Sequence, residues 1–365
     1  MIVPRRVGVQ RGRLSSGGTW AGVSFVRAGP YNPCMAQRFR VVITDFITDD
    51  LAPERQVLGE LADLVALDAS SEQDLIGRVE DAAALMLYHN IEISRATIDR
   101  LRDCKLIVRC GVGYDNVDRV FARSRGIAVA NVPDYGTEEV ADSAIGLMLT
   151  LTRGIHLLNS IYRGGTSGWT YRSAVPVHRL RGRVFGVIGF GRIGTAAAVR
   201  ARALGMDVVF YDPYKPDGYD KALGIRRAET LDELLRQTFV LSVHTPLTPE
   251  TQGMINAQTI ARMPRGSFLV NTARGAVVDT SAIPAAIASG QLAGAGIDVL
   301  AVEPPPADDP LVRAWRDPTH AAYHRVIVNP HSAFYAEEGL LDMRRKGAEA
   351  VRNALLGRPL RNVVN

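Results

Sequence analysis

Three glycines place the strongest constraint on the fold of this chain. Gly189, Gly191 and Gly194 form a G-x-G-x-x-G pattern directly after the apolar run VFGVI and directly before an Ala-rich segment. The first glycine permits a tight turn, the second lets the backbone approach a pyrophosphate, and the third lets a helix pack closely on the strand. The phosphates would then face the helix N-terminus, at Arg192 and Ile193. The pattern alone is weak because many turns match it, so its context matters.

An acidic residue supplies that context. The next apolar run, DVVFYD, ends in Asp212, eighteen residues after Gly194. A carboxylate at this spacing can accept hydrogen bonds from the adenosine ribose hydroxyls, and it would repel a 2′-phosphate. No arginine follows Asp212 directly, although Lys215 lies three residues further on. We therefore predict that the bound dinucleotide is NAD and that NADP is disfavoured.

Apolar runs alternate with helical patterns along most of the chain. The first series comprises RVVITDF, AALMLYH, KLIVRCG and IAVANVP, and the second comprises VFGVIGF, DVVFYD, FVLSVH, SFLVN, GAGIDV and VIVN. Such alternation predicts an α/β fold of two Rossmann-like or flavodoxin-like domains, with parallel sheets and the active site in the cleft between them. A long apolar helix from about Thr137 to Tyr162 would connect the two series.

The expected domain boundaries follow from these series. We expect a substrate (catalytic) domain over residues 37–136 and 332–365, and an NAD-binding domain over residues 137–331. The return to the first domain rests on a helix of about Ala336 to Leu356, which follows the last strand and could pack back on it. No internal repeat is visible.

The net charge of +5 is confined to the beginning of the chain. Residues 1–34 contain five arginines and no Lys, Asp or Glu, so the remainder has no net charge. We therefore expect no nucleic-acid partner. Residues 1–36 are rich in Arg, Gly and Ser and predict disorder; initiation of translation at Met35 and an organellar transit peptide both stay open.

Other classes of protein are disfavoured by the sequence. No apolar run is long enough to cross a membrane, so we expect a cytoplasmic protein. The three cysteines, Cys34, Cys104 and Cys110, show no CxxC spacing and are interpreted as core residues. His320 and His324 are four residues apart, but no acidic or Cys companion accompanies them, so no metal site is predicted.

Three further clusters follow strand ends of the second series, where open α/β sheets bind ligands. They are NTARG at 271–275, DVLAVEP at 298–304 and NPHSAF at 329–334. In this order after the glycine pattern, they resemble the D-2-hydroxyacid dehydrogenases over about residues 39–360. Within that family, the resemblance is closest to the C-terminal binding proteins, which are NAD(H)-dependent transcriptional corepressors. It rests on the segments RCGVGYDNVD, NVP with EEVADS, VVFYDPY, FLVNTARG and HSAFY.

The resemblance implies a catalytic role for three residues. Arg274 would hold the substrate carboxylate and keto oxygen, His331 would act as acid and base, and Glu303 would pair with His331. Their chemistry agrees: a guanidinium fits a carboxylate bidentately, and a carboxylate partner favours the protonated imidazole that donates to a forming alkoxide. Taken singly, an arginine at a strand end is as often a surface charge as a functional residue. A glutamate before prolines is likewise as often a solvated loop residue.

The same resemblance and the strand-end positions give a wider set of contacts. The first-domain side of the substrate site would be formed by Arg109 and by the loop Gly111, Val112 and Gly113, whose amides would face the carboxylate. Asp115 and Asp118 are interpreted as organising the turn around that loop. Asp298 would contact the nicotinamide amide, and His244 would lie beside the cofactor. The remaining expected cofactor contacts are Pro213, Tyr214, Thr245, Pro246, Thr251, Thr272, Ala273, Arg274, His331 and Ser332.

Departures from the family pattern leave the substrate open. The corepressors have Trp where this chain has Phe334, which would make the side chain over the substrate pocket smaller. The segment between Glu303 and His331 is also longer than is common in the family. Our leading interpretation is a 2-keto acid reductase, or the reverse oxidation. The alternatives are a phosphoglycerate dehydrogenase and an NAD(H)-sensing corepressor or scaffold with protein partners. A homodimer formed through the connector helix and the neighbouring surface of the second domain is expected by resemblance.

Overall fold

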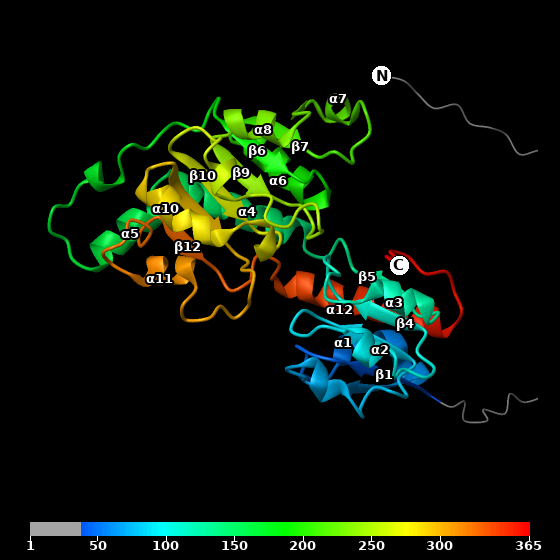
Figure 1. The fold of residues 1–365 in the computed structure, drawn as a ribbon. Coiled ribbons are helices and arrows are strands. Elements are labelled where there is room, and N and C mark those ends of the chain that lie inside the picture. Colours follow the sequence, from blue (N-terminus) through cyan, green and yellow to red (C-terminus); the bar gives the residue numbers. More distant parts are fainter. Residues whose placement is uncertain (1–37) are drawn as a thin grey trace, which may run out of the picture. The chain divides into compact units, whose positions relative to one another are not determined.

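The computed structural model describes residues 38–365. The disorder predicted for residues 1–36, the open question at Met35 and the interpretation of Cys34 lie outside the described residues. Within the described part, the chain forms two parallel sheets, as predicted (Figure 1).

The first sheet has five parallel strands in the order β2-β1-β3-β4-β5. Four of them match the predicted runs, and β2 was missed because this edge strand is largely half-exposed and lacks a continuous apolar run. The strands are β1 (Phe39–Ile43), β2 (Ala62–Ala66), β3 (Ala84–Leu87), β4 (Leu106–Arg109) and β5 (Ala128–Asn131). The helices between them are α1 (Ala52–Leu58), η1 (Gly59–Leu61), η2 (Glu72–Leu75), α2 (Arg95–Ile98) and α3 (Arg119–Ser124).

The second sheet has seven parallel strands in the order β12-β11-β10-β9-β6-β7-β8. The six predicted strands are present, and β8 adds a two-residue edge strand that was not predicted. The strands are β6 (Val184–Ile188), β7 (Asp207–Tyr211), β8 (Arg226–Arg227), β9 (Val240–Val243), β10 (Ser267–Asn271), β11 (Leu292–Ile297) and β12 (Val326–Val328). The helices are α6 (Arg192–Ala203), α7 (Tyr219–Leu223), α8 (Leu231–Gln237), α9 (Ala257–Ile260), η4 (Gly275–Val277), η5 (Thr280–Ala282), α10 (Ile283–Ala288) and α11 (Pro310–Arg316).

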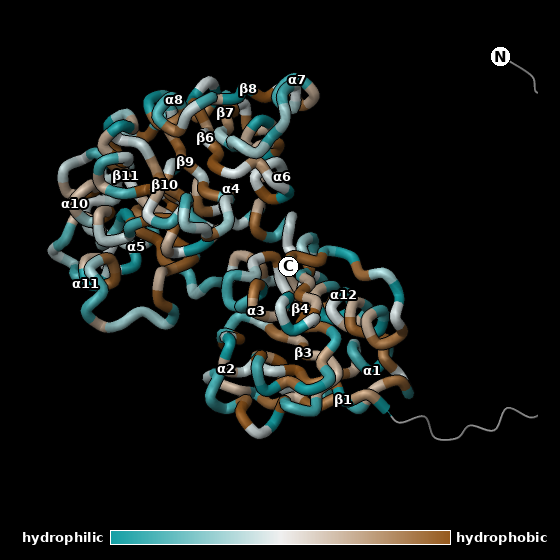
Figure 2. Tube along the Cα trace, turned by 45° about the vertical axis from the view of Figure 1, so that its right-hand side comes forward, coloured by the Kyte–Doolittle hydropathy of each residue, from teal (hydrophilic) through white to brown (hydrophobic). Residues whose placement is uncertain are grey.

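Both sheets are apolar on their two faces. Four clusters of buried hydrophobic side chains lie along the strands, and Figure 2 shows brown, hydrophobic residues concentrated there with teal residues on the outer loops. This is the pattern of parallel sheets covered by helices on both sides. Cys104 and Cys110 are buried in these clusters as free thiols, as interpreted from the sequence. Part of the long segment before His331 is ordered as α11, whose Leu311 and Val312 are buried.

The predicted connector is two helices and not one. α4 (Thr137–Thr152) ends near Gly154, and α5 (Ile155–Arg163) leaves at an angle of 63°. Gly154 has a positive φ of 65°, and a Cβ there would lie 2.9 Å from the Cβ of Ala174. This glycine therefore breaks the helix that the apolar periodicity had predicted as continuous. α4 packs against α6, β10 and β11.

A helix that crosses a membrane needs about 20 consecutive apolar residues. In residues 38–365 no single helix is long and apolar enough to cross a bilayer. Among the described residues, α4 and α5 taken together are long and apolar enough, but they form a pair bent by 63°.

The last helix and the last residues contact the first sheet. α12 (Glu337–Leu355) packs against α1, β3 and β4, and it appears in orange-red beside them in Figure 1. Arg344 of α12 is buried and bonds both carboxylate oxygens of Glu54 in α1 at 2.7 Å. Residues 362–365 then run beside β5, where the Val364 amide donates to the Val129 carbonyl at 2.8 Å.

Candidate active site

The glycine turn has the geometry that a dinucleotide requires. Gly189 has a φ of 83°, and a Cβ there would lie 2.7 Å from the backbone of His244. A Cβ on Gly194 would lie 2.1 Å from the Gly189 carbonyl oxygen, whereas a Cβ on Gly191 would meet nothing within 4 Å. The first and third glycines therefore serve the turn and the helix packing, and the second leaves open space at the N-terminus of α6.

The carboxylate of Asp212 is fixed at the end of β7. It accepts hydrogen bonds from the Phe190 amide at 2.8 Å and from the Tyr214 amide at 3.0 Å. Tyr214 also donates its hydroxyl hydrogen to Glu250, so a second acid lies near this end of the site, which the sequence analysis did not identify. The ammonium of Lys215 lies over the Tyr219 ring, 4.9 Å from its centroid. Two acids thus make this place unfavourable for a 2′-phosphate.

Two buried polar atoms near the other predicted cofactor residues have no partner. Thr272 Oγ1 and His244 Nδ1 are buried and form no hydrogen bond among the described residues. His244 Nε2 is 2.8 Å from Ser242 Oγ, and burial lowers the pKa of His244 to about 4, so this imidazole is neutral. Thr251 closes the adjacent loop by donating to the Pro246 carbonyl at 2.6 Å. Unpaired buried polar atoms of this kind suit a site that completes its hydrogen bonds with a bound cofactor.

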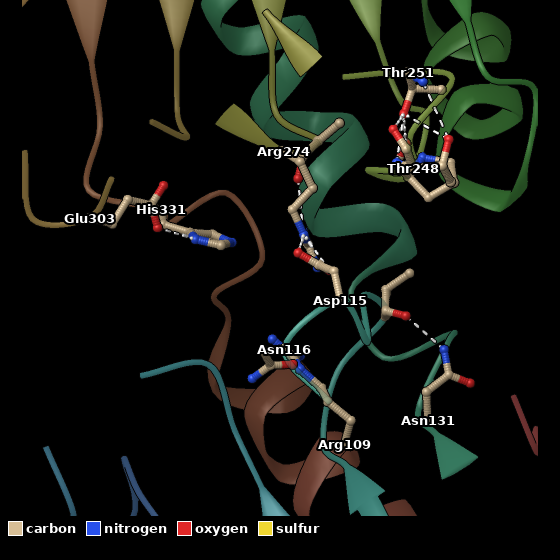
Figure 3. Close-up of polar contacts among 12 residues, drawn as sticks. Arg109, Asp115, Asn116, Asn131, Thr248, Thr251, Arg274, Glu303 and His331 are labelled. Carbon is tan, nitrogen blue, oxygen red and sulfur yellow. Dashed lines mark hydrogen bonds and ion pairs between the residues drawn. The ribbon is translucent and has the colours of Figure 1, made fainter. Parts of the chain in front are cut away.

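His331 and Glu303 form the central polar pair of the site (Figure 3). His331 Nδ1 lies 2.7 Å from Glu303 Oε2, and the other oxygen of Glu303 accepts the Leu300 amide at 2.8 Å. Burial alone would raise the pKa of Glu303, but the hydrogen bond and charge of His331 outweigh it and hold the pKa below its usual value. The pairing that the family resemblance implied is therefore present, and Glu303 is a carboxylate near neutral pH.

The backbone at His331 is held in an uncommon conformation. Its φ is 51°, in the left-handed region that non-glycine residues rarely adopt. The buried carboxylate of Asp298 accepts the amides of Ser332 at 2.9 Å and Ala333 at 3.1 Å, and the His331 amide donates to the Asp298 carbonyl at 2.8 Å. Burial raises the pKa of Asp298. Asp298 thus orients the loop that carries His331, and its contact with nicotinamide stays a prediction.

Two guanidinium groups line the same cavity as His331 and Glu303. The cavity has a volume of about 170 Å³, and both Arg109 and Arg274 contribute to its wall. Arg109 is 6% exposed, donates to the Cys110 carbonyl and has a buried Nε without a partner. Its burial and the nearby charge of Arg274 lower the pKa of Arg109. Two cations in one small cavity, with a buried guanidinium nitrogen of Arg109 left without a partner, favour an anionic ligand.

Asp115 has a different role from the one interpreted from the sequence. Arg274 Nε donates to Asp115 Oδ1 at 3.0 Å and to Oδ2 at 3.3 Å, as Figure 3 shows. Burial would raise the pKa of Asp115, but the charge of Arg274 outweighs it and the pKa is lowered. Asp118 accepts the Phe121 amide at the start of α3, in agreement with its interpreted role in the turn. Asp115 instead orients the guanidinium across the cavity.

The loop between β4 and α3 is shaped around the two arginines. A Cβ on Gly111 would lie 1.4 Å from Nη1 of Arg109, and a Cβ on Gly113 would lie 1.4 Å from Nη2 of Arg274. Between them, the Val112 carbonyl accepts a hydrogen bond from the Asn131 side chain at 2.7 Å. The two glycines therefore make room for the guanidinium groups, which the sequence alone did not reveal.

Substitution of Gly113 by alanine tests this packing. We expect kcat/KM for the best substrate to fall by about 2 kcal/mol, roughly 30-fold, because Arg274 must leave its position. The free energy of unfolding should change by less than about 1 kcal/mol, since a flexible side-chain end can move aside. Gly146→Ala is the matched control, because a Cβ at this position in α4 meets nothing within 4 Å. Equal activity of the two variants would contradict the packing argument.

Phe334, the predicted pocket residue, belongs to an aromatic group that the sequence analysis only partly identified. Its ring centroid lies 6.0 Å from that of His331 and 5.6 Å from that of His89. His89 follows β3 and lines the cavity. In the sequence, the position of His89 directly after a predicted strand of the first domain could have identified it as a candidate site residue. Between Arg38 and Asn365, no three His, Cys, Asp or Glu side chains are grouped as metal ligands.

Comparison with known proteins gives one consistent family. Residues 145–333 match the model of the D-isomer specific 2-hydroxyacid dehydrogenase, NAD binding domain. C-terminal-binding protein 1 of Caenorhabditis elegans is 33% identical over 85% of this chain and 42% of its own length. D-3-phosphoglycerate dehydrogenase of Methanocaldococcus jannaschii is 31% identical over 89% of this chain and 59% of its own length. The chain thus spans about half the length of these relatives.

Solved structures agree with this assignment. The D-lactate dehydrogenase of Aquifex aeolicus, complexed with NAD and lactic acid, is 28% identical, with a TM-score of 0.77 over 87% of this chain and 96% of that one. The glycine turn, Asp212 and the unpaired buried atoms beside them fit the same cofactor. The chain therefore belongs to the D-isomer specific 2-hydroxyacid dehydrogenase family, and its cofactor is NAD.

Proposed function

We propose that this protein interconverts a D-2-hydroxy acid and its 2-keto acid by NAD-dependent hydride transfer. The observation that carries the proposal is the cavity of about 170 Å³ whose wall includes the His331–Glu303 pair and two guanidinium groups. Such a cavity offers an anion anchor beside a proton donor. When bound, NADH supplies the hydride that carbon 2 of the keto acid receives, and NAD⁺ accepts it in the reverse direction.

The arginines are assigned to substrate binding. Arg274 donates through Nε to Asp115 and through Nη1 to the Ala273 carbonyl, and its Nη2 has no partner in residues 38–365. This free donor and the incompletely bonded Arg109 can bind the carboxylate and keto oxygen of the substrate. Asp115 keeps the Arg274 guanidinium oriented before the substrate arrives, which reduces the entropic cost of binding.

His331 is assigned to proton transfer. Its Nδ1 faces Glu303, which leaves Nε2 for the substrate oxygen. During reduction, the imidazolium gives a proton to the oxygen on carbon 2 as hydride reaches that carbon. During oxidation, the neutral imidazole takes the hydroxyl proton back. Glu303 stabilises the charged imidazole in both directions and fixes which nitrogen faces the substrate.

The cavity favours a small acid without a phosphate group. Among the described residues of its wall, Arg109 and Arg274 are the permanently charged cations, and Asp115 and Glu303 are acids. A phosphoglycerate would need a further cation for its phosphate. We therefore place phosphoglycerate oxidation second. A corepressor or scaffold role, suggested by the nematode relative, is the alternative outside catalysis.

A panel of 2-keto acids assayed with NADH by loss of absorbance tests the proposal. We expect turnover of at least one small keto acid, and Arg274→Lys should lower kcat/KM by about 3 kcal/mol, roughly 150-fold, since lysine lacks the bidentate fork. An unchanged kcat/KM in this variant would refute the role of Arg274. If no keto acid reacts while NADH binds tightly, the scaffold alternative is favoured.

We also propose a homodimer, formed by α5 and the segment that follows it. Large apolar side chains are exposed there, namely Ile155 (55%), Trp169 (75%), Tyr171 (72%) and Val175 (52%). Exposed apolar side chains on one segment support the proposal, because large apolar patches occur at protein–protein interfaces. In α4, the other part of the predicted connector, eight of the sixteen residues are buried within the chain, among them its large apolar side chains Ile145, Leu147, Met148 and Leu151.

Gel filtration with light scattering checks the proposed dimer. The protein is expected to elute at twice the mass of one chain, and the double variant Trp169→Glu/Tyr171→Glu at the mass of one, because two buried charges would oppose association. A monomeric wild type would overturn the dimer proposal.

A further inference from the structure

His89 faces the active-site cavity from the first domain. It lies in the loop after β3 and lines the cavity together with His331 and the two arginines. Its ring centroid is 5.6 Å from that of His331 and 4.7 Å from that of Phe46. In residues 38–365 neither nitrogen of the His89 ring has a hydrogen-bond partner. A polar group of the substrate can therefore reach it without displacing a protein contact.

The backbone on both sides of His89 is tied down by two side chains. Asp45 is fully buried, and its carboxylate accepts the amides of Tyr88 at 2.9 Å and Asn90 at 2.8 Å. The Asn116 side chain donates to the carbonyls of Tyr88 at 3.1 Å and Ile91 at 2.8 Å. These four hydrogen bonds fix the backbone on both sides of His89. A loop held in this way positions its side chain with the precision that discrimination between substrates needs.

Aromatic rings support His89 from behind. Phe46 has a φ of 70°, an unfavourable conformation for a bulky side chain, and it packs against both His89 and Tyr88. Phe334 contacts the His89 ring edge-on from the loop after His331. Strained residues of this kind persist where the surrounding structure holds them, and they concentrate at functional sites.

The charge state of His89 narrows the chemistry that it can recognise. Burial, together with the positive charge of Arg109, lowers the pKa of His89 to about 4. The ring is therefore neutral near pH 7, with one N–H donor and one acceptor. A hydroxyl can pair with either nitrogen. A second carboxylate or a phosphate would find no positive charge at His89, and a methyl group would leave the ring nitrogens without a partner.

We propose that His89 determines specificity by hydrogen bonding to a hydroxyl group on carbon 3 of the substrate, so that 3-hydroxy-2-keto acids are preferred. This inference rests on the proposed function. The carboxylate of a 2-keto acid would bind Arg109 and Arg274, and its keto oxygen would face His331. In that orientation carbon 3 lies nearest to His89. A buried site that forms a hydrogen bond to a hydroxyl discriminates strongly against an analogue that lacks it.

Hydroxypyruvate and 2-oxobutyrate provide the test, because they differ by a hydroxyl against a methyl group on carbon 3. We expect wild-type kcat/KM with NADH to be at least about tenfold higher for hydroxypyruvate. His89→Phe keeps an aromatic ring but lacks the nitrogens, and it should bring the ratio of the two kcat/KM values close to one. His89→Gln keeps a neutral donor and acceptor and should retain part of the preference. His178→Phe, an exposed histidine outside the cavity wall, is the matched control and should keep the wild-type ratio.

The outcomes separate this inference from the proposed function. If wild type reduces 2-oxobutyrate as well as hydroxypyruvate, or if His89→Phe keeps the wild-type ratio, the assignment of His89 is overturned while the dehydrogenase activity stands. If wild type reduces neither these nor any other 2-keto acid, the proposed function fails and the assignment fails with it. Circular dichroism and NADH binding of each variant establish that a changed ratio reflects recognition and not misfolding.

Discussion

Replacing His331 by alanine is expected to lower kcat about 10²–10⁴-fold, the range found when a general acid is removed. The reason is geometric: His331 Nδ1 is held by Glu303 at 2.7 Å, so Nε2 is the proton donor that the cavity offers to the substrate oxygen. NADH oxidation at saturating substrate measures this effect. NADH binding, followed by fluorescence, should weaken far less than turnover.

Glu303→Gln is the matched comparison for this variant. The amide oxygen can still accept from His331, but it carries no charge to stabilise the imidazolium. We therefore expect a smaller loss of kcat than in His331→Ala, and little additional loss when both substitutions are combined, because the two residues act as one unit. A His331→Ala enzyme with wild-type kcat would show that the proton comes from elsewhere.

The second large effect is on stability and concerns the buried ion pair between α1 and α12. Glu54 is fully buried, and Arg344 is 5% exposed. Glu54→Ala leaves a buried guanidinium with only Asp49 as its acidic partner. Removal of one member of such a pair costs about 3–5 kcal/mol. Urea unfolding followed by circular dichroism should show this loss as a lower midpoint with an unchanged slope.

Two further variants separate charge from packing at this ion pair. Asp49→Asn should cost much less, because the Asp49 side chain is 52% exposed. The double variant Glu54→Leu/Arg344→Met should recover most of the stability lost in Glu54→Ala, since apolar residues of similar volume replace buried pairs well. A double variant as unstable as the single one would assign the loss to packing alone.

The contact between Asp49 and Arg344 makes the stability of the folded protein depend on pH. The Arg344 hydrogen bond outweighs partial burial and holds the pKa of Asp49 below its usual value. A carboxylate with a lowered pKa in the folded state contributes stability above its unfolded pKa and loses it as the pH falls. The contribution of Asp49 should thus be complete near pH 7 and decline below about pH 4.

The sequence predicted most of the second domain because its strands are continuous apolar runs. Arg274, Glu303 and His331 each follow such a run, and the carboxyl ends of parallel strands share one edge of a sheet. Their convergence was therefore predictable without coordinates. β2 and β8 were missed because short edge strands have little apolar patterning. The break at Gly154 was missed because periodicity continues across it and a single glycine is tolerated in many helices.

The contacts between the domains could not be predicted in the same way. Asp115 and Arg274 are 159 residues apart, and no local pattern indicates that an acid near a turn will reach a distant guanidinium. Asp115 was interpreted as part of its own turn, a common role for aspartate. His89 was passed over for a similar reason, because a histidine after a strand acquires meaning only when the opposite wall of the cavity is known.

The pairing of residues 362–365 with β5 has a consequence for the behaviour of the protein in solution. A strand at the end of a sheet exposes unpaired amides and carbonyls that can recruit another chain into a growing aggregate. Here the Asn131 amide bonds the Asn362 carbonyl at 3.1 Å, and the Asn365 side chain accepts the Val129 amide at 2.9 Å. Residues 362–365 thus shield this strand from intermolecular pairing. Their deletion would expose the strand and favour precipitation during purification.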